Sequence, residues 1–309
     1  MIGGTGGAGS AIVRELGRRG LPVRVVTRSG RVGGGVGSEA EAIQADATDP
    51  DTLTAALAGA ETVYHAANVP YPEWYETLPR LMESVIEAAR RTGTRVVYVD
   101  NMYMYGPVAG PLTETSPQDP ATRKGRLRKR LADRLLAAHA AGTVRATIGR
   151  ASDYFGPGVT NAATGERFFP PILAGNKTMW PVNADVPHSL SFIDDVARVL
   201  VTLGQRDEAL GEVWHAPTAP ALTGRAYARL AAQAAGAEAG VSVMPGLAFR
   251  ALGLFNPLLR EVAEMGYQFA APFVTDGAKF AAAFGGCPTP HDEAMGATVA
   301  WYREKADRG

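Results

Sequence analysis

Short strand-like runs alternate with longer helix-like segments along the first half of the chain, and this alternation restricts the fold more than any other feature. Runs rich in β-branched and aromatic residues, which are typical of strands, lie at residues 23–27, 62–67, 95–100 and 144–151. Between them, residues 8–20, 78–91 and 123–141 have apolar residues at helical spacing. Strands that alternate with helices form a parallel sheet with right-handed crossovers. The sequence therefore predicts an α/β fold with a doubly wound parallel sheet.

Length and composition fit one large domain or two lobes. The chain has 309 residues, of which 46% are hydrophobic and 20% charged. This is the profile of a globular protein that buries a sizeable core. The alternation fades after Ala151, which predicts a smaller and less regular lobe in the C-terminal half. The glycine-rich residues 31–37 are expected to form a surface loop.

Charge and cysteine content exclude several classes of partner. Lys+Arg 31 and Asp+Glu 31 give a formal net charge of +0, which argues against a nucleic-acid binder or a basic membrane-surface protein. The chain has 1 cysteine, Cys287, and none of its 5 histidines has metal-ligand spacing to another, so we expect no disulfide and no metal. No apolar run approaches the ~18 residues of a membrane span, and no signal peptide opens the chain. We therefore expect a cytoplasmic monomer or homodimer that acts on a small molecule.

The chain opens with a glycine pattern that is typical of a phosphate-binding turn. Gly3, Gly6 and Gly9 have the spacing G-x-x-G-x-x-G directly before an apolar helix. In such a turn the first glycine permits the sharp bend, the second lets the backbone approach a pyrophosphate, and the third packs helix against strand. We predict cofactor contacts from Gly3, Thr5, Gly6, Gly7, Ala8 and Gly9. Only Met1 and Ile2 precede the turn, so the first strand is a stub or is completed by residues before Met1.

The end of the second strand indicates which dinucleotide binds. An Asp or Glu at this place holds the ribose 2′-hydroxyl of NAD, whereas an arginine accommodates the 2′-phosphate of NADP. This chain has Arg28 there, followed by Ser29, which favours NADP(H) through a charge-assisted contact. Asp46 and Ala47 end the next short strand, where a carboxylate can accept from the adenine amino group. A solvated loop arginine is the alternative for Arg28, because further arginines lie nearby.

Short motifs are spread over nearly the whole chain. They are residues 3–9, His65-Ala66-Ala67, Tyr105-Gly106-Pro107, Gly156-Pro157-Gly158, Phe192-Ile193-Asp194-Asp195-Val196-Ala197 and Pro288-Thr289-Pro290. Together they resemble the extended short-chain dehydrogenase/reductases, which include the NAD-dependent epimerase/dehydratases. The resemblance implies a Rossmann domain with the cofactor at the carboxyl edge of the sheet, contacted by His65, Ala66 and Ala67. We assign residues 1–151 and 187–216 to this NADP-binding domain, and residues 152–186 and 217–309 to a substrate-binding lobe.

The catalytic residues that the resemblance implies are not all present. Family members use a Ser or Thr shortly before the Tyr-Gly, then a Tyr-x-x-x-Lys pair on the next helix. The lysine lowers the pKa of the tyrosine, which transfers the proton, and also binds the nicotinamide ribose. Here the Ser/Thr position is Asn101, and residues 123–133 contain no tyrosine. One register places Lys124 and Arg128 at the two positions, and the other places Gly125 and Lys129 there.

Asn101, Tyr103 and Lys124 are the candidate catalytic residues, and Lys124 and Arg128 are candidate cofactor contacts. Asn101 can donate a hydrogen bond to an oxyanion but cannot release a proton, and Tyr103 can act only if it faces the cleft. Ordinary alternatives are a backbone cap at Asn101, a packing role for Tyr103 and a solvated basic helix face. We therefore expect the proton to come from the substrate itself or from water.

Asp153, Tyr154, Trp180 and His188 are the candidate substrate contacts. Asp153 lies where the family often has an asparagine near the nicotinamide, and His188 precedes a segment where the family meets substrate. The C-terminal half is rich in large apolar side chains. They suit a flat hydrophobic substrate, and the alternative is that most of them form the hydrophobic core. A sugar nucleotide would need several arginines for its diphosphate, and this half of the chain does contain arginines.

The sequence thus favours NADPH-dependent reduction of a ketone on a hydrophobic small molecule. In lacking this tyrosine, the chain resembles the aromatic-polyketide ketoreductases of angucyclinone (simocyclinone-type) pathways. Those enzymes belong to antibiotic biosynthesis and also lack the catalytic triad. One alternative is a sugar-nucleotide epimerase or dehydratase. The other is a non-catalytic NADP-binding sensor or regulator.

Overall fold

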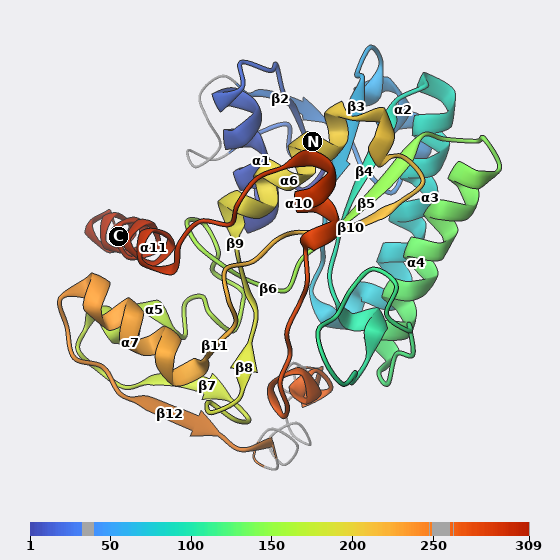
Figure 1. The fold of residues 1–309 in the computed structure, drawn as a ribbon. Coiled ribbons are helices and arrows are strands. Elements are labelled where there is room, and N and C mark those ends of the chain that lie inside the picture. Colours follow the sequence, from blue (N-terminus) through green and yellow to red (C-terminus); the bar gives the residue numbers. More distant parts are fainter. Residues whose placement is uncertain (33–39, 247, 249–259, 262, 309) are drawn as a thin grey trace.

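A parallel sheet with helices on both faces forms the larger part of the molecule (Figure 1). The computed structural model describes residues 1–32, 40–246, 248, 260–261 and 263–308. The strands run in the order β2, β1, the Met1-Ile2 stub, β3, β4, β5 and β10. Their bounds are β1 Arg24–Thr27, β2 Glu41–Gln44, β3 Thr62–His65, β4 Arg95–Asp100, β5 Ala146–Arg150 and β10 Val213–His215. This topology is a Rossmann fold, and the predicted fold class is confirmed.

Two residues act as the central strand. The Ile2 N–H donates to the Tyr64 carbonyl at 2.9 Å, and the Ala66 N–H donates to the Ile2 carbonyl at 3.0 Å. On the other side the Val26 N–H donates to the Met1 carbonyl at 2.9 Å. The stub therefore joins β1 to β3 and delivers the glycine-rich turn to the middle of the carboxyl edge.

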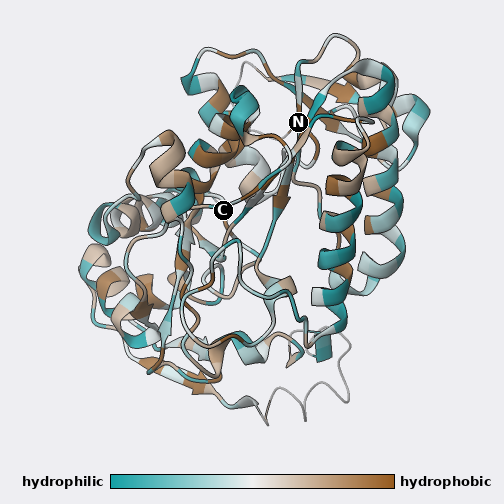
Figure 2. Cartoon of the chain, turned by 45° about the vertical axis from the view of Figure 1, so that its right-hand side comes forward, coloured by the Kyte–Doolittle hydropathy of each residue, from teal (hydrophilic) through white to brown (hydrophobic). Residues whose placement is uncertain are grey.

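Alternate residues of the central strands pack into two separate apolar layers, one on each face of the sheet. Val96 packs with the layer under α2, α3 and α4, whereas Val97 packs with the layer under α1 and α6. The helices on the first face are α2 Pro50–Leu57, α3 Trp74–Thr92 and α4 Arg123–Ala140, and those on the second are α1 Gly7–Arg18 and α6 Ile193–Gln205. Hydrophilic and hydrophobic residues share each outer helix, as Figure 2 shows. The helical periodicity predicted for residues 78–91 is confirmed within α3.

The C-terminal half forms a smaller lobe with its own core. Its helices are α5 Phe169–Leu173, α7 Gly224–Ala235 and α11 His291–Asp307, whereas α10 Ala278–Phe284 packs on Trp214 of β10 and belongs to the core of the sheet domain. Its strands are β6 Asp153–Phe155, β7 Thr178–Pro181, β8 Pro187–His188, β9 Leu190–Phe192, β11 Leu222–Thr223 and β12 Val241–Met244, and they form pairs β6–β9, β7–β12 and β8–β11. Short 3-10 turns are η1 Tyr71–Glu73, η2 Tyr103–Tyr105, η3 Asp207–Ala209 and η4 Gly266–Phe269. Aromatic side chains such as Phe168, Trp180 and Tyr227 fill this core.

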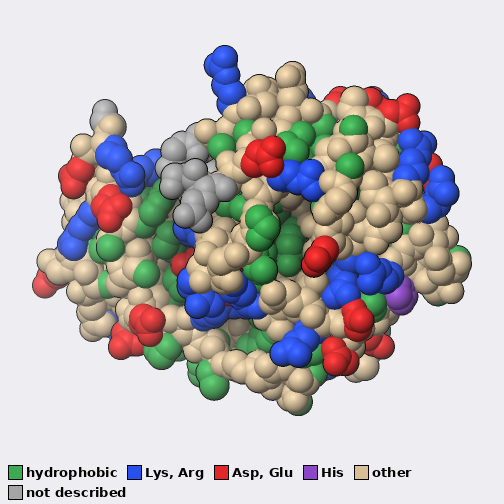
Figure 3. All heavy atoms as spheres, turned by 90° about the horizontal axis from the view of Figure 1, so that it is seen from above, with side chains coloured by type: hydrophobic (Ala, Val, Ile, Leu, Met, Phe, Trp, Pro, Cys, Tyr) green, Lys and Arg blue, Asp and Glu red, His purple; other side chains and the backbone are tan. Residues whose placement is uncertain are grey.

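The structure bears only in part on the predicted surface loop and on the expected absence of a membrane span. Most of the surface loop predicted at residues 31–37 lies outside the described residues. Among the residues that are described, no helix is both long and apolar enough to cross a membrane. Acidic and basic side chains are interspersed over the face seen in Figure 3.

Candidate dinucleotide and substrate site

The glycine-rich turn combines two tightly packed glycines with one open glycine. A Cβ on Gly3, which has φ +81°, would lie 2.6 Å from the backbone of Ala67. A Cβ on Gly9 would lie 2.0 Å from the Gly3 carbonyl oxygen. On Gly6, in contrast, the nearest described atom would be that same oxygen, at 3.6 Å. The space beside Gly6 is therefore open, in the direction from which a ligand would approach the turn.

The N-terminus of α1 is free to receive an anion. Gly6 is the N-cap residue and has an extended backbone, and no side chain caps the helix. Thr5 and Gly6 are exposed, and Gly7 and Ala8 are half-buried. Uncapped N–H groups and the helix dipole favour a negatively charged group at this place. The residues present therefore fit the pyrophosphate of a dinucleotide.

The ends of β1 and β2 bring Arg28 and Asp46 near each other. Arg28 and Ser29 are exposed in the turn after β1, and Asp46 and Ala47 follow β2. Asp46 Oδ1 accepts from the Thr48 N–H at 2.9 Å and from the Thr48 hydroxyl at 2.8 Å. These hydrogen bonds, with a smaller contribution from the charge of Arg28, lower the pKa of Asp46. Arg28 forms no salt bridge with any other residue in the described part of the chain.

The residues after β3 lie beneath the glycine-rich turn. Ala66 and Ala67 are half-buried, and Ala67 contacts Gly3. His65 is buried against the Tyr98 ring, with centroids 5.2 Å apart, and its Nδ1 has no hydrogen-bond partner among the described residues. Burial lowers the pKa of His65 to about 3, so the ring is neutral at neutral pH. We predicted that His65 contacts the cofactor directly. In this structure its side chain is 2% exposed and lies under the site.

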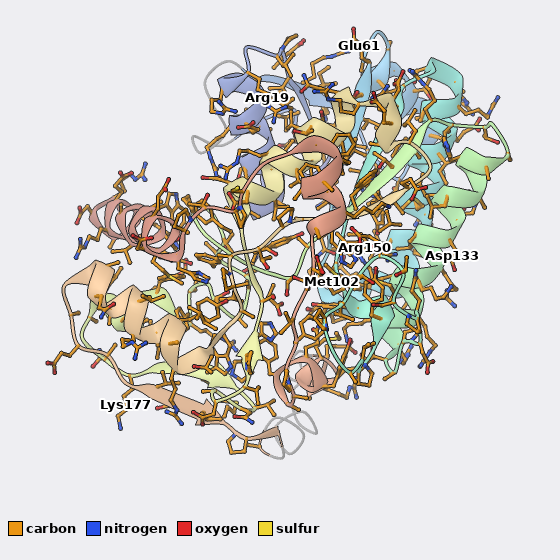
Figure 4. All side chains as sticks on the ribbon, viewed as in Figure 1. Arg19, Glu61, Met102, Asp133, Arg150 and Lys177 are labelled. Carbon is orange, nitrogen blue, oxygen red and sulfur yellow. The ribbon has the colours of Figure 1, made fainter. Side chains whose placement is uncertain are left out.

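A buried network joins the carboxyl ends of β4 and β5. Asp100, which has a fully buried side chain, accepts from Arg128 Nε at 2.9 Å and from Arg150 Nε at 3.0 Å. Arg128 Nη2 also donates to the Val99 carbonyl at 3.2 Å. Figure 4 labels Arg150 at this end of the sheet. One buried carboxylate is therefore shared by two guanidinium groups, one on a strand and one on α4.

The network continues to β10. Arg150 Nη1 donates to the Tyr105 hydroxyl at 2.9 Å, and that hydroxyl lies 2.6 Å from His215 Nε2. His215 Nδ1 lies 3.2 Å from the Asp276 carbonyl, which can only accept. The ring is therefore neutral with its proton on Nδ1. Burial, with a contribution from the charge of Arg150, lowers the pKa of His215 to about 4.

This lowered pKa gives a stability prediction. The unfolded chain binds the His215 proton below its ordinary pKa of 6.5, whereas the folded chain binds it only below about 4. The unfolded state therefore holds more protons between these values, and the free energy of unfolding falls as the pH falls through this window. We expect His215→Gln to reduce that slope at about pH 5 by roughly one proton, which is about 1.4 kcal/mol per pH unit. Urea unfolding over a pH series measures the slope, and an unchanged slope would contradict the assignment.

The structure gives Lys124 partners other than a cofactor. Its side chain is 0% exposed, and Nζ forms ion pairs with Glu261 and, at 2.6 Å, with Glu264. Glu264 also accepts from the Lys124 N–H at 3.3 Å and from the Arg123 N–H, so it caps α4. The cofactor contact predicted for Lys124 stays a prediction, and in this structure its ammonium group is paired with two carboxylates. Arg128 is also paired, because its Nε donates to Asp100.

The basic residues of α4 also differ in burial. Lys124 and Arg128, four residues apart, lie on the buried face of the helix. Lys129 is half-exposed and pairs with Asp133 at 2.7 Å on the outer face. Lys124 and Arg128 thus share the buried face of α4, and the alignment of this helix with the family's two catalytic positions stays a prediction.

Asn101 and Tyr103 have local partners. Asn101 Oδ1 accepts from the Tyr103 N–H at 3.0 Å, which is the backbone-capping alternative. The Tyr103 hydroxyl lies 3.1 Å from that of Tyr71. Burial, followed by the charges of Tyr71 and Asp153, raises the pKa of Tyr103 well above its ordinary value. This shift is opposite to the one that activates a catalytic tyrosine.

The four candidate substrate residues divide into two groups. Asp153 Oδ2 lies 2.8 Å from His188 Nε2, and Tyr154 is half-buried beside them. Trp180, however, is 1% exposed and packs against Phe168, Tyr227 and Phe269. The substrate contact predicted for Trp180 stays a prediction, and in this structure its indole packs in the core of the lobe.

Several residues at the site were not predicted. Tyr71, Glu261, Glu264 and Tyr267 come from segments far from α4 in sequence, and no motif marks them. Arg150 could have been found, because it ends a predicted strand beside the strand that ends in Asp100.

These features define a class: an α/β protein with a dinucleotide-binding turn at the carboxyl edge of a parallel sheet and a second lobe beside that edge. The sequence profile of the NAD dependent epimerase/dehydratase family matches residues 1–215, and the chain belongs to this family. A nicotinamide dinucleotide is accordingly the class of cofactor for this fold. No curated protein matches the chain in sequence.

Solved structures share the fold at low sequence identity. The dTDP-glucose 4,6-dehydratase DesIV from Streptomyces venezuelae, with NAD bound, has a TM-score of 0.78 at 20% identity, covering 99% of this chain and 97% of that one. The UDP-glucuronic acid 4-epimerase from Bacillus cereus, also with NAD, has a TM-score of 0.79 at 15% identity over 100% and 97%. The protein gox2253 has a TM-score of 0.80 at 21% identity over 98% and 97%.

Proposed function

We propose that this chain is an NADPH-dependent ketoreductase whose substrate is a hydrophobic small molecule. The observation that carries the proposal is a group of aromatic side chains after the carboxyl ends of β3 and β4, called the aromatic lining here: Tyr71 and Tyr103 are half-buried, and Trp74, on which both pack, is buried. Tyr71 packs on Trp74 at 4.9 Å between centroids, and Trp74 stacks on Tyr103 at 6.3 Å. Tyr267 donates to the Tyr103 carbonyl at 3.5 Å from the C-terminal lobe. Aromatic faces contributed by both parts of the chain suit a flat apolar ligand.

Several cations in this region are already paired, which weighs against a sugar nucleotide. Arg128 and Arg150 share Asp100, and Lys124 is held by Glu261 and Glu264. In the lobe, Arg225 pairs with Asp185 at 2.7 Å. A diphosphate needs cations that can turn toward it. The absence of tyrosine from α4 also favours a reaction other than the usual one of the family.

Each part of the chain has a defined task in this proposal. The dinucleotide supplies a hydride when it is bound in its reduced form. The glycine-rich turn holds the pyrophosphate at the N-terminus of α1, and Arg28 holds the 2′-phosphate. The aromatic lining orients the ketone and excludes water, so that its carbon lies at near-attack distance.

A panel of carbonyl compounds tests the function directly. We expect NADPH oxidation with aromatic ketones and none with sugar nucleotides. The similarity to DesIV and to the 4-epimerase supports the alternative, in which a dTDP- or UDP-sugar is converted with no net cofactor consumption. Binding of NADPH without turnover of either substrate class would favour the sensor or regulator instead.

The choice of cofactor rests on Arg28. We expect NADPH to bind more tightly than NADH, and Arg28→Asp to reverse the preference. A charge-assisted hydrogen bond contributes about 1.5–3 kcal/mol, which is roughly tenfold or more in affinity. Calorimetric titration of both cofactors measures the change. Arg134→Asp is the matched control, because Arg134 pairs with Glu83 on the outer face of α4; equal affinities of the unmodified protein for the two cofactors would contradict the assignment.

A further inference from the structure

We propose that Asp153, paired with His188, gives the proton to the carbonyl oxygen as the ketone is reduced. The inference rests on the proposed function and replaces the substrate- or water-derived proton that the sequence suggested. The two residues lie 35 positions apart and come from β6 and β8. The fold joins them at the open side of the sheet edge.

The hydrogen bonds of His188 require an additional proton in this pair. Its Nδ1 lies 3.2 Å from the Gln268 carbonyl, which accepts only, so Nδ1 carries a hydrogen. Its Nε2 lies 2.8 Å from Asp153 Oδ2. Either Nε2 also carries a hydrogen and donates to a carboxylate, or the carboxyl carries it and donates to Nε2. In both cases the pair holds one proton more than a neutral imidazole and a carboxylate together.

The surroundings leave that proton a single exit. His188 is 1% exposed, and its ring stacks on Phe269 at 4.4 Å and on Phe273 at 5.3 Å between centroids. The edge of Trp180 closes a further side at 6.1 Å. Asp153, in contrast, is 19% exposed. A proton therefore passes to a ligand through the carboxyl group of Asp153, and the imidazole of His188 holds that carboxyl group in place.

The position of Asp153 is that of a group facing a bound carbonyl. It follows the end of β5 by three residues, and β5 lies beside β4, where the nicotinamide half of a dinucleotide is expected. The groups that face it are the hydroxyls of Tyr71, Tyr103, Tyr154 and Tyr267.

The neighbouring hydroxyls are poor competitors as acids. Burial, followed by the charge of Asp153, raises the pKa of Tyr267, and both effects raise that of Tyr71 as well. Burial raises the pKa of Tyr154 to about 12. The guanidinium of Arg128 does not release a proton at all. Among the described groups at this edge, the Asp153–His188 pair is the one whose hydrogen bonds hold an additional, transferable proton.

The step balances as follows. The carbonyl carbon gains a C–H bond and two electrons as a hydride from the reduced dinucleotide, which becomes oxidised. The C=O π pair moves to oxygen, which forms an O–H bond with the proton of Asp153. The pair is left as a carboxylate and a neutral imidazole, and water returns its proton before the next turnover.

The first test needs neither cofactor nor substrate. Proton NMR of the full chain should show a far-downfield signal from the hydrogen between Asp153 and His188, absent from both Asp153→Asn and His188→Gln. Asp185→Asn, which changes an exposed carboxylate of the same lobe, should retain it. A spectrum without this signal, or with the signal unchanged in Asp153→Asn, overturns the pairing.

The second test uses NADPH and benzil, an aromatic diketone with no acidic proton of its own. We expect Asp153→Asn to lower kcat by about 10²-fold or more, in the range for loss of a general acid, with NADPH affinity unchanged. Asp153→Glu should recover part of the rate. An Asp153→Asn rate near that of the unmodified protein would overturn the inference alone. Failure of the unmodified protein to reduce any ketone would overturn the proposed function and this step together, while the NMR signal would still decide the pairing.

Discussion

Asp100→Asn is expected to lower the free energy of unfolding by about 3–5 kcal/mol, because it removes the carboxylate that two buried guanidinium groups share. Asp100 accepts from Arg128 at 2.9 Å and from Arg150 at 3.0 Å, and all three side chains are buried. An asparagine keeps the shape of the residue but leaves two guanidinium groups without a counter-charge. Urea unfolding at neutral pH measures the loss.

An exposed pair provides the control. Asp51 is 80% exposed and pairs with Arg91 at 2.5 Å. Asp51→Asn should change stability by less than about 1 kcal/mol, as surface ion pairs do. Similar losses for the two variants would mean that the Asp100 network is not held as the structure indicates.

The second large effect concerns the glycine-rich turn. Gly6→Val should leave the protein folded, at a cost of about 1 kcal/mol or less for a poor N-cap residue, because its Cβ meets the nearest described atom at 3.6 Å. It should weaken dinucleotide binding by about 10²-fold or more, because the side chain would keep the pyrophosphate from the backbone N–H groups, and each charge-assisted hydrogen bond is worth about 1.5–3 kcal/mol. Calorimetric titration with NADPH measures the affinity.

Gly9→Val is the matched comparison in the same turn. Its Cβ would lie 2.0 Å from the Gly3 carbonyl oxygen, so the turn and α1 cannot both keep their places. We expect a loss of stability larger than about 3 kcal/mol, beyond ordinary overpacking. Normal NADPH binding by a folded Gly6→Val protein would show that the pyrophosphate lies elsewhere.

The fold was predictable because its signals are local. Strand runs, helical spacing and the glycines at 3, 6 and 9 each concern neighbouring residues, and a parallel α/β sheet follows from their alternation. Arg28 was proposed from its place at the end of a predicted strand, since the carboxyl ends of parallel strands share one edge. Asn101 and Asp153 were proposed from the resemblance to the family, and all three assignments stay predictions.

The partners of those residues were not predictable from sequence. Glu264 neutralises Lys124 from 140 residues away, and no charge pattern along the chain indicates it. His188 reaches Asp153 because a short strand of the C-terminal lobe places it there. Trp180 is of a residue type that often binds ligands, yet its ring stacks on that of Tyr227, with centroids 6.1 Å apart, and is part of the core. Such choices depend on tertiary packing rather than on residue type.

The most direct test of the proposed ketoreductase is the fate of a labelled hydride. NADPH carrying deuterium at C4 of the nicotinamide is incubated with the protein and benzil, and the product is analysed by mass spectrometry and NMR. The account predicts deuterium on the new carbinol carbon in an amount equal to the NADPH oxidised. Recovery of unlabelled benzil and unoxidised NADPH, together with conversion of a sugar nucleotide by the same preparation, would contradict it.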